Sequence, residues 1–366
     1  MQAWGSGFWL PLLTSFTAAG IVTGLVVKYG KRLGIMDDPA VHKHPKVVHE
    51  RPVPRGGGIP IWTALIIGTV IFLPDNKRAW GVVAGATILA ITGWWDDRWG
   101  EKMSPYLRLG LNVAAALAVI GVGIGIAYIT NPLGGIIRLD MPQWCFWLGG
   151  ERRCIWIMAD LFALVWLVWM QNIVGWSSGV DGQLPGFVII AAITIAALGQ
   201  RFSGDFGQWP VITTAGITAG AYLGFLLWNF YPQKIMPGYG GKSLAGFLLG
   251  VIAIMSGAKV GAMAMVLAVP FIDAFWVIVK RLREGRSPVW GGPDHLHHFL
   301  LARKWGRRKI AVFYWGISLV LAIGVLQLNA GAKYFTMAAV ALIITGMVLW
   351  LQNWSTYSKQ RGPDNG

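Results

Sequence analysis

The stretch Val211-Ile-Thr-Thr-Ala-Gly-Ile-Thr-Ala-Gly-Ala-Tyr-Leu-Gly-Phe-Leu-Leu-Trp-Asn-Phe-Tyr231 contains no charged side chain. About 17–25 predominantly apolar residues are enough for an α-helix to cross a bilayer. The apolar residues run continuously instead of alternating, and this pattern favours a transmembrane helix over a strand of a membrane barrel. The stretch is therefore predicted to be a membrane-spanning helix.

Similar apolar runs recur along the whole chain. The composition is 55% hydrophobic and 13% charged, whereas soluble domains carry about 25% charged residues. We therefore predict an all-α, polytopic integral membrane protein of about 11 transmembrane helices, with one polytopic domain over 1–352 and a polar tail over 353–366. The remaining predicted spans are centred near 8–27, 59–73, 80–95, 107–129, 156–172, 186–200, 243–257, 259–280, 309–328 and 334–352.

The distribution of Lys and Arg predicts the orientation. With eleven spans, the loops at 28–58, 96–108, 173–185, 232–242 and 280–309 share one side with the C-terminal tail and carry 23 of the 31 basic residues. Basic loops stay in the cytoplasm, so we expect the N-terminus outside, the C-terminus inside and a location in the cytoplasmic (inner) membrane. The first span lacks a basic leader and a cleavage pattern, which favours a retained helix over a signal peptide.

The net charge of +15 suits anionic lipid headgroups and anionic substrates. Nucleic acid is not an expected partner, because the cations are spread over membrane loops. Cys145 and Cys154 both fall in the predicted outward loop 130–155. A disulfide between them is plausible in an oxidising compartment, and two unlinked thiols are the alternative, because spacing alone does not fix the geometry.

The polar clusters all lie on the predicted cytoplasmic side, although only Lys and Arg were used to assign it. The most unusual is Asp294-His-Leu-His-His298, with three histidines beside a run of cations. A membrane protein gains no stability from that many imidazoles in one loop. The cluster therefore indicates a site for an anionic, phosphorylated ligand, whereas a zinc site is less expected because its ligands would be His and Asp only.

Carboxylates and glycine-rich turns mark the other cytoplasmic clusters. Adjacent Asp96 and Asp97 at the end of a span are costly to desolvate, and they suit Mg²⁺ with substrate phosphates; the alternative is a water-facing pair bridged to Arg98 and Lys102. Asp273 lies inside an apolar stretch and is a functional candidate or a buried structural acid. Glycine-rich turns that suit phosphate binding, or are simple turns, occur at Arg55-Gly-Gly-Gly58, Gly175–Gly182 and Pro237–Ser243.

Taken in order, these stretches resemble the polyprenyl-phosphate N-acetylhexosamine-1-phosphate transferase family (glycosyltransferase family 4). That family includes phospho-N-acetylmuramoyl-pentapeptide transferase and undecaprenyl-phosphate GlcNAc-1-phosphate transferases. The resemblance covers roughly residues 35–300, and the H-x-H-H end is more similar to the GlcNAc branch. The matching pieces are Pro54-Arg55-Gly56-Gly57-Gly58, Gly93-x-x-Asp96-Asp97, Asn172, Asp181-Gly182, Gly224-Phe225-Leu226-x-x-Asn229-x-x-Pro232, Pro270-x-x-Asp273 with Arg281, and His295-Leu296-His297-His298.

The resemblance implies a phosphotransferase of the EC 2.7.8 type. It would move N-acetylhexosamine-1-phosphate from a UDP-sugar to undecaprenyl phosphate, releasing UMP and forming a polyprenyl-diphospho-sugar for envelope glycan synthesis. The resemblance also implies Mg²⁺, or Mn²⁺, as cofactor, and a homodimer is left open. The implied catalytic and metal-binding residues are Asp96, Asp97 and Asp181, and the implied substrate-binding residues are Arg55, Asn172, Asn229, Lys242, Arg281, His295, His297 and His298.

The chain departs from the family pattern at positions that matter for metal binding. Ser178 stands where the family has an aspartate, and Tyr239 stands where it has a metal-binding aspartate. Gly292 aligns with a further aspartate, which Asp294 replaces after a shift. These changes weaken the predicted metal site, and they make Lys242 a candidate for part of the metal's charge role.

Two other classes of function are therefore kept beside the transferase. One is a non-catalytic membrane protein that binds polyprenyl phosphate or a nucleotide sugar. The other is a carrier, which eleven spans and the intramembrane Asp273 would also suit. Against a carrier, the sequence shows no convincing inverted repeat, and the polar groups gather on one face instead of at the midplane.

Overall fold

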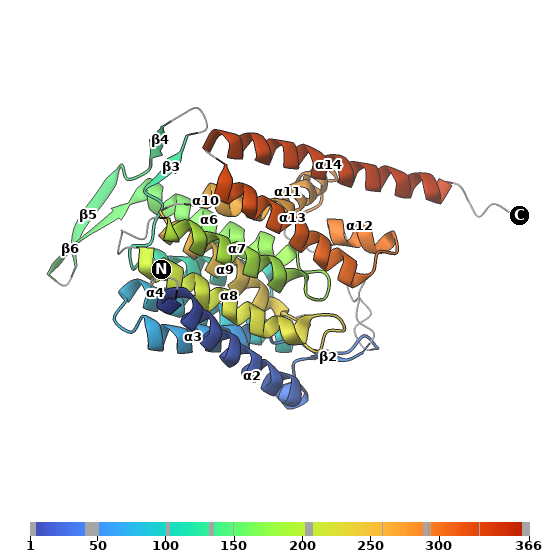
Figure 1. The fold of residues 1–366 in the computed structure, drawn as a ribbon, viewed down its shortest axis with the longest axis horizontal. Coiled ribbons are helices and arrows are strands. Elements are labelled where there is room, and N and C mark those ends of the chain that lie inside the picture. Colours follow the sequence, from blue (N-terminus) through green and yellow to red (C-terminus); the bar gives the residue numbers. More distant parts are fainter. Residues whose placement is uncertain are drawn as a thin grey trace, which may run out of the picture.

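The computed structural model describes residues 5–40, 51–99, 103–131, 135–148, 150–201, 208–257, 259–287, 292, 294–328 and 330–360. This part of the chain is mostly helical, and Figure 1 shows the helices gathered into one bundle. The long helices are α2 (Leu10–Leu33), α3 (Gly58–Phe72), α4 (Lys77–Trp99), α5 (Pro105–Ile120), α6 (Ile157–Trp176), α7 (Gln183–Gln200), α8 (Trp209–Asn229), α9 (Gly238–Met255), α11 (Ala268–Arg283), α13 (Arg307–Gln327) and α14 (Ala330–Gln360). The short ones are η1 (Gly5–Trp9), α10 (Val260–Val266) and α12 (Leu296–Ala302).

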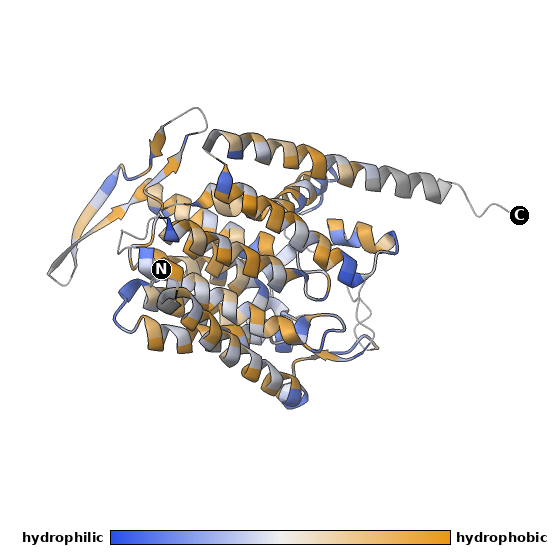
Figure 2. Ribbon diagram, in the orientation of Figure 1, coloured by the Kyte–Doolittle hydropathy of each residue, from blue (hydrophilic) through white to orange (hydrophobic). Residues whose placement is uncertain are grey.

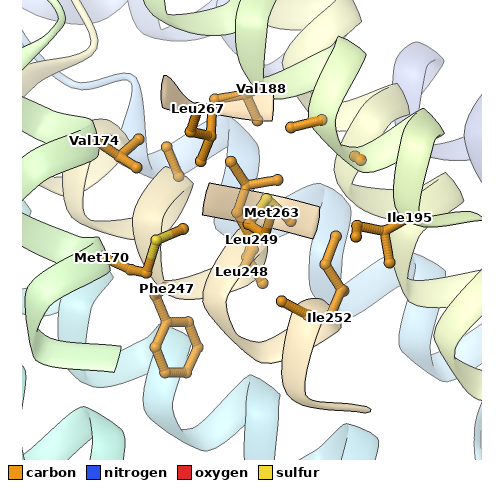
Figure 3. Packing of buried hydrophobic residues seen from close by; sticks show 14 of the residues in the cluster. Met170, Val174, Val188, Ile195, Phe247, Leu248, Leu249, Ile252, Met263 and Leu267 are labelled. Carbon is orange, nitrogen blue, oxygen red and sulfur yellow. The ribbon is translucent and has the colours of Figure 1, made fainter. Parts of the chain in front are cut away.

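Helix α9 lies at the centre of the bundle. It packs against α3, α4, α5, α6, α7, α8 and α10. Figure 3 shows Phe247, Leu249 and Ile252 of α9 among Met170 of α6 and Met263 of α10. Because other helices surround α9, the residues at its first turn are held in a fixed position. That turn forms part of the functional site described below.

The chain is a multi-pass membrane protein. Within the described residues, seven helices are long and apolar enough to cross a bilayer: Gly7–Leu33, Ile157–Trp176, Gln183–Gln200, Trp209–Asn229, Gly238–Met255, Arg307–Gln327 and Gly331–Trp350. The pair α10 and α11 makes an eighth if it is counted as one span. Figure 2 shows that hydrophobic residues dominate these helices.

Each of the eleven predicted segments falls on a helix, but the structure does not confirm eleven spans. Helices α3 and α5, which match 59–73 and 107–129, are apolar but short, and α4, which matches 80–95, is not among the seven. Helix α14 continues to Gln360, so the first part of the predicted polar tail is helical. Residues 361–366 lie outside the described residues.

Two predicted segments differ in shape from the prediction. The segment 107–129 is helical only to Ile120, and Tyr128–Thr130 form strand β3. Gly121 caps α5, and Gly123 has a φ of 81°, which ends a helix. The segment 259–280 is bent by 84° between α10 and α11. Pro270 lies in the first turn of α11, where its missing N–H is tolerated, but it could not continue a helix begun by α10.

Within the described residues, three short antiparallel strand pairs interrupt the predicted all-α fold. They are β1 (Met36–Asp37) with β2 (Val53–Pro54), β3 with β4 (Ile136–Arg138), and β5 (Gln143–Leu148) with β6 (Glu151–Trp156). Cys145 and Cys154 are opposite each other in the last hairpin and form a disulfide. The structure thus resolves the choice left open by the sequence in favour of the disulfide.

Candidate functional site

Three glycines bring the site's main helices into backbone contact. Gly58 of α3, Gly93 of α4 and Gly240 of α9 meet at one point. A Cβ on Gly93 would overlap the Gly240 backbone, and one on Gly58 would lie 3.0 Å from the Gly240 Cα. Glycine is the one residue that allows such an approach. This three-glycine contact fixes the end of α4, which carries two aspartates, against the first turn of α9.

The two aspartates at the end of α4 are both buried. Asp97, whose exposed fraction is 7%, accepts a 2.9 Å hydrogen bond at Oδ1 from the Tyr239 N–H. The carboxylate also rests against Gly238, where a Cβ would overlap it; Gly238 has a φ of 61°, which favours glycine. The sequence-predicted pair therefore lies at the N-terminus of α9 and is not a water-facing helix end.

Cations from three elements surround this pair. The Arg108 Nη2 atom of α5 lies 2.5 Å from Asp96 Oδ1. Arg55 follows β2, and the charges of Arg55 and of Lys242 in α9 act on both aspartates. We call Asp96, Asp97, Arg55, Arg108 and Lys242 the acidic cluster. Burial of adjacent carboxylates is tolerable here because cations offset their charge.

The alternative pairing to Arg98 is not observed among the described residues. Arg98 stacks on the Trp99 ring, with its guanidinium carbon 4.6 Å from the ring centroid. Lys102 lies outside the described residues. Arg55 is held by its backbone: its N–H donates to the Ile35 carbonyl at 2.7 Å, and the residue forms a bridge with Met236, just before α9.

Arg108 and Asn112 are site residues that the sequence reasoning missed. The Tyr239 hydroxyl donates to Asn112 Oδ1 at 2.9 Å, and the Arg108 guanidinium lies 5.5 Å from the centroid of the Tyr239 ring. Tyr239 thus fills the place beside Asp97 and is fixed by α5. In the sequence, Arg108 counted only as one of the basic residues that predict the orientation. Asn112, a polar residue inside a predicted span, was the overlooked sign of a site residue on this helix.

Asp181 lies in a separate turn that other residues hold. Its Oδ2 accepts from the Gln233 N–H at 3.2 Å and lies 3.8 Å from Arg307 Nη1. Asn229 supports the same turn: its Oδ1 accepts from the Gly182 N–H at 3.0 Å, and its Nδ2 donates to the Ile235 carbonyl at 2.9 Å. The polar atoms of Asn229 are therefore used within the protein, which makes it a support of the turn.

The histidine loop, Asp294–His298, is anchored by α11. Asp273, whose exposed fraction is 1%, accepts from the Leu296 N–H at 2.7 Å and lies 2.8 Å from His295 Nδ1. Arg281 and Lys280 bind Asp294 at 3.3 and 2.7 Å. Asp273 and Arg281, both on α11, thus face the same loop.

The charge of Asp294 is stabilised by its cations. Burial raises the pKa of Asp294, but the hydrogen bond from Lys280 and the charges of Lys280, Arg281 and Arg286 outweigh it and hold the pKa below its usual range. Asp294 is therefore ionised and paired, which leaves it little capacity to replace a missing metal ligand.

His297 joins the histidine loop to the end of α6. Its ring lies against Gly179, where a Cβ would overlap Nε2. Burial, together with the charges of His298, His295 and Lys242, holds the pKa of His297 well below its usual range, so the ring is neutral at pH 7. Within the described part of the chain, its buried Nδ1 has no hydrogen-bond partner.

Lys242 connects the two aspartates of α4 to the histidine loop. A Cβ on Gly175 of α6 would be 3.3 Å from the Lys242 Cβ, and the Lys242 charge acts on Asp96, Asp97 and His297. Asn172, one turn earlier on α6, is half-buried and donates to the Val168 carbonyl at 2.7 Å. The structure thus brings together Asp96, Asp97, Arg55, Lys242 and His297 and sets Asp181 and Asn229 in the neighbouring turn.

The residues present do not fit the Mg²⁺ site expected from sequence. Among the described residues, no group of three or more His, Cys, Asp and Glu side chains is arranged to hold a metal ion. Asp96 is paired with Arg108, and Asp181 is near Arg307. Mg²⁺ requires oxygen ligands in near-octahedral order, whereas this donor set is two carboxylates among three cations. Binding of Mg²⁺ or Mn²⁺ therefore stays a prediction.

Comparisons with known proteins agree with the motifs in this site. The sequence model of glycosyl transferase family 4 matches residues 79–257. The chain is 26% identical to the decaprenyl-phosphate N-acetylglucosaminephosphotransferase of Mycolicibacterium smegmatis, over 96% of this chain and 89% of that protein. It is 23% identical to a probable undecaprenyl-phosphate N-acetylglucosaminyl 1-phosphate transferase of Bacillus subtilis, over 92% and 88%. It is 26% identical to the phospho-N-acetylmuramoyl-pentapeptide-transferase of Moorella thermoacetica, over 75% and 84%.

Proposed function

We propose, because this chain belongs to glycosyl transferase family 4, that it transfers an N-acetylhexosamine-1-phosphate from a UDP-sugar to undecaprenyl phosphate or a similar polyprenyl phosphate. The products are UMP and a polyprenyl-diphospho-sugar for cell-envelope glycan synthesis, so the activity is of the EC 2.7.8 type. The observation that carries the proposal is the acidic cluster: two buried carboxylates fixed beside three cations at the first turn of α9.

The chemistry assigns a role to each half of the site. An oxygen of the lipid phosphate attacks the sugar-bearing phosphorus of the donor and forms a new P–O bond. The P–O bond between that phosphorus and the bridging oxygen breaks, and the bridging oxygen leaves as part of UMP. Asp97 positions the lipid phosphate and takes its proton, as a general base within hydrogen-bond reach. Asp96, paired with Arg108, keeps that guanidinium beside the reacting phosphates.

The histidine loop contributes the donor side of the site. Arg281 orders Asp294, and the neutral ring of His297 offers Nδ1 to a phosphate oxygen. His295 is used to tie the loop to Asp273, so its role is to position the loop. We assign Arg55 and His298 to the substrate-facing rim. Asn172 of α6, Asp181 of the turn before α7 and Asn229 at the end of α8 are assigned to its support.

We place the reaction on the cytoplasmic face of the inner membrane. Figure 1 shows the β5–β6 hairpin at the opposite end of the bundle from α12 and β2. A disulfide in that hairpin suits an oxidising exterior, which supports an inward-facing site and agrees with the Lys and Arg distribution. A homodimer remains a prediction.

The test is UMP release by the purified, detergent-solubilised protein with undecaprenyl phosphate and a panel of UDP-sugars. Release with one UDP-N-acetylhexosamine would support the proposal and identify the donor. The non-catalytic alternative is favoured by Ser178 and Tyr239 at positions of family aspartates. Binding of a UDP-sugar without UMP release from any donor would support that alternative and contradict the transferase.

A further inference from the structure

We propose that the Lys242 ammonium is a built-in counter-charge for the donor's diphosphate, so that this chain binds a nucleoside diphosphate without a divalent cation. The proposal depends on the proposed function only for the class of ligand. It follows from the mismatch between the acidic cluster and a metal site, and from the placement of Lys242.

The first step is the position of the lysine on α9. Tyr239, whose hydroxyl binds Asn112 of α5, is three residues before Lys242 on α9, and the Lys242 charge acts on Asp96 and Asp97 at the end of α4. Gly175 leaves space for the lysine stem beside α6. The stem of Lys242 therefore lies between the ends of α4 and α6, which are the two walls of the site.

The second step is the balance of charge. Asp96 and Asp97 lie beside Arg55, Arg108 and Lys242, and Arg55 also lies 3.9 Å from Asp37. Carboxylates that are already offset by three cations offer little attraction to a divalent cation. The same three cations offer charge-assisted hydrogen bonds to a diphosphate.

The third step concerns Tyr239, which stands where the family pattern has a metal-binding aspartate. Tyr239 is held by Asn112 through its hydroxyl and lies beneath the Arg108 guanidinium. A phenol has no negative charge to offer a cation at pH 7. The side chain thus directs Arg108 toward Asp96 and fills space that a hydrated metal ion would need.

The fourth step concerns a buried polar atom of His297. His297 is 2% exposed, and within the described residues its Nδ1 has no hydrogen-bond partner. Buried polar groups are normally satisfied. The neutral ring lies within range of the Lys242 charge, so a phosphate oxygen bound by the ammonium would satisfy His297 as well.

The experiment measures UDP binding to the full-length protein in detergent by calorimetry, once in EDTA and once with Mg²⁺. The wild-type dissociation constant should change by less than about threefold between the two conditions. Lys242→Gln should weaken binding in EDTA by on the order of tenfold or more, because a charge-assisted contact is lost. Lys31→Gln, on the exposed end of α2, is the matched control and should bind as the wild type does.

Two further variants separate charge from folding. Lys242→Arg keeps the charge and should stay within about threefold of the wild type in EDTA. Tyr239→Asp adds a carboxylate beside Asp97 and should make UDP binding depend on Mg²⁺. The comparison of wild type in EDTA and in Mg²⁺ needs no variant, so a folding defect in Lys242→Gln cannot hide the result.

The inference is overturned if EDTA abolishes UDP binding to the wild type, or if Lys242→Gln binds UDP in EDTA as well as the wild type does. UMP release that stops in EDTA together with UDP binding would overturn this inference and leave the proposed function standing. UDP binding in EDTA by a protein that releases no UMP from any donor would uphold the inference and overturn the transferase.

Discussion

The two aspartates of the acidic cluster and Asp273, which anchors the histidine loop, are all buried, but their partners differ. Asp96 pairs with Arg108, Asp97 accepts from the Tyr239 N–H, and both lie near the side-chain charges of Arg55 and Lys242. Asp273 is bound by the N–H of Leu296 and by His295, which belong to one short segment. A side-chain cation can rotate from its carboxylate to an incoming phosphate. A backbone N–H cannot leave its carboxylate unless the loop unfolds.

This difference separates an acid that performs chemistry from an acid that builds the site. Both kinds are buried, so burial alone does not distinguish them. Asp97 is predicted to act on substrate, and Asp273 to position the loop that carries His297. The four variants below test that division, from the largest expected effect to the smallest.

Asp97→Asn should give the largest effect. Losing a general base lowers rates by about 10²–10⁴-fold, which corresponds to about 3–5 kcal/mol of activation free energy. UMP release measures it, and the thermal unfolding curve should stay close to that of the wild type. Asp75→Asn, an exposed aspartate between α3 and α4, is the control. Unchanged turnover in Asp97→Asn would show that the acidic cluster does not carry out the reaction.

Asp273→Ala should act mainly on stability. It leaves the Leu296 N–H and His295 Nδ1 without their acceptor, and each buried unsatisfied group costs about 1–3 kcal/mol. The apparent melting temperature of Asp273→Ala should fall. Asp273→Asn keeps an acceptor oxygen, so its melting temperature should fall less. If Asp273→Ala melts like the wild type yet loses turnover, Asp273 belongs with the reacting groups.

Gly179→Ala tests whether the histidine loop must be seated on α6. The added methyl would overlap His297 Nε2 and push the ring away. Displacement of a substrate-contacting group by about 1 Å costs up to about 10²-fold, so UDP-sugar affinity should fall by on the order of tenfold. Gly316→Ala, which has open space at its Cβ, is the matched control. Equal affinities for the two variants would show that His297 does not contact the donor.

Loss of the disulfide should affect the site least. Replacing Cys145 and Cys154 by Ser removes a link across the β5–β6 hairpin, which lies at the far end of the bundle. A short loop of this kind gains about 2–3 kcal/mol from its disulfide, so the hairpin should become more sensitive to protease. UMP release should remain within about twofold of wild type. A large loss of UMP release would show that the hairpin affects the site at the other end of the bundle.

The helices could be predicted because continuous apolar runs leave few alternatives. The interruptions were harder, although the signals were present. Gly121 and Gly123 end α5, and Pro270 separates α10 from α11. The β5–β6 hairpin was missed, although Gly149-Gly150 between an aromatic-rich stretch and Cys154-Ile-Trp156 is typical of a hairpin.

The site was predictable where a family motif marks a residue and not where a contact depends on packing. Asp97 and His297 were predicted from family motifs and Lys242 from a glycine-rich turn, and the structure brings the three together. The pairing of Arg108 with Asp96 and of Asn112 with Tyr239 depends on how α5 packs beside α4 and α9. No spacing within α5 reveals that packing.

The contact of Gly58, Gly93 and Gly240 also limits how a protein of this kind can diverge. Even one methyl group at Gly93 would meet the backbone of α9, so α3, α4 and α9 cannot slide past each other to suit a new sugar. Selection for another donor must then act on the segments 175–182 and 294–298, which border this immobile frame. A mutational library aimed at donor choice should randomise those two segments and leave the glycines untouched.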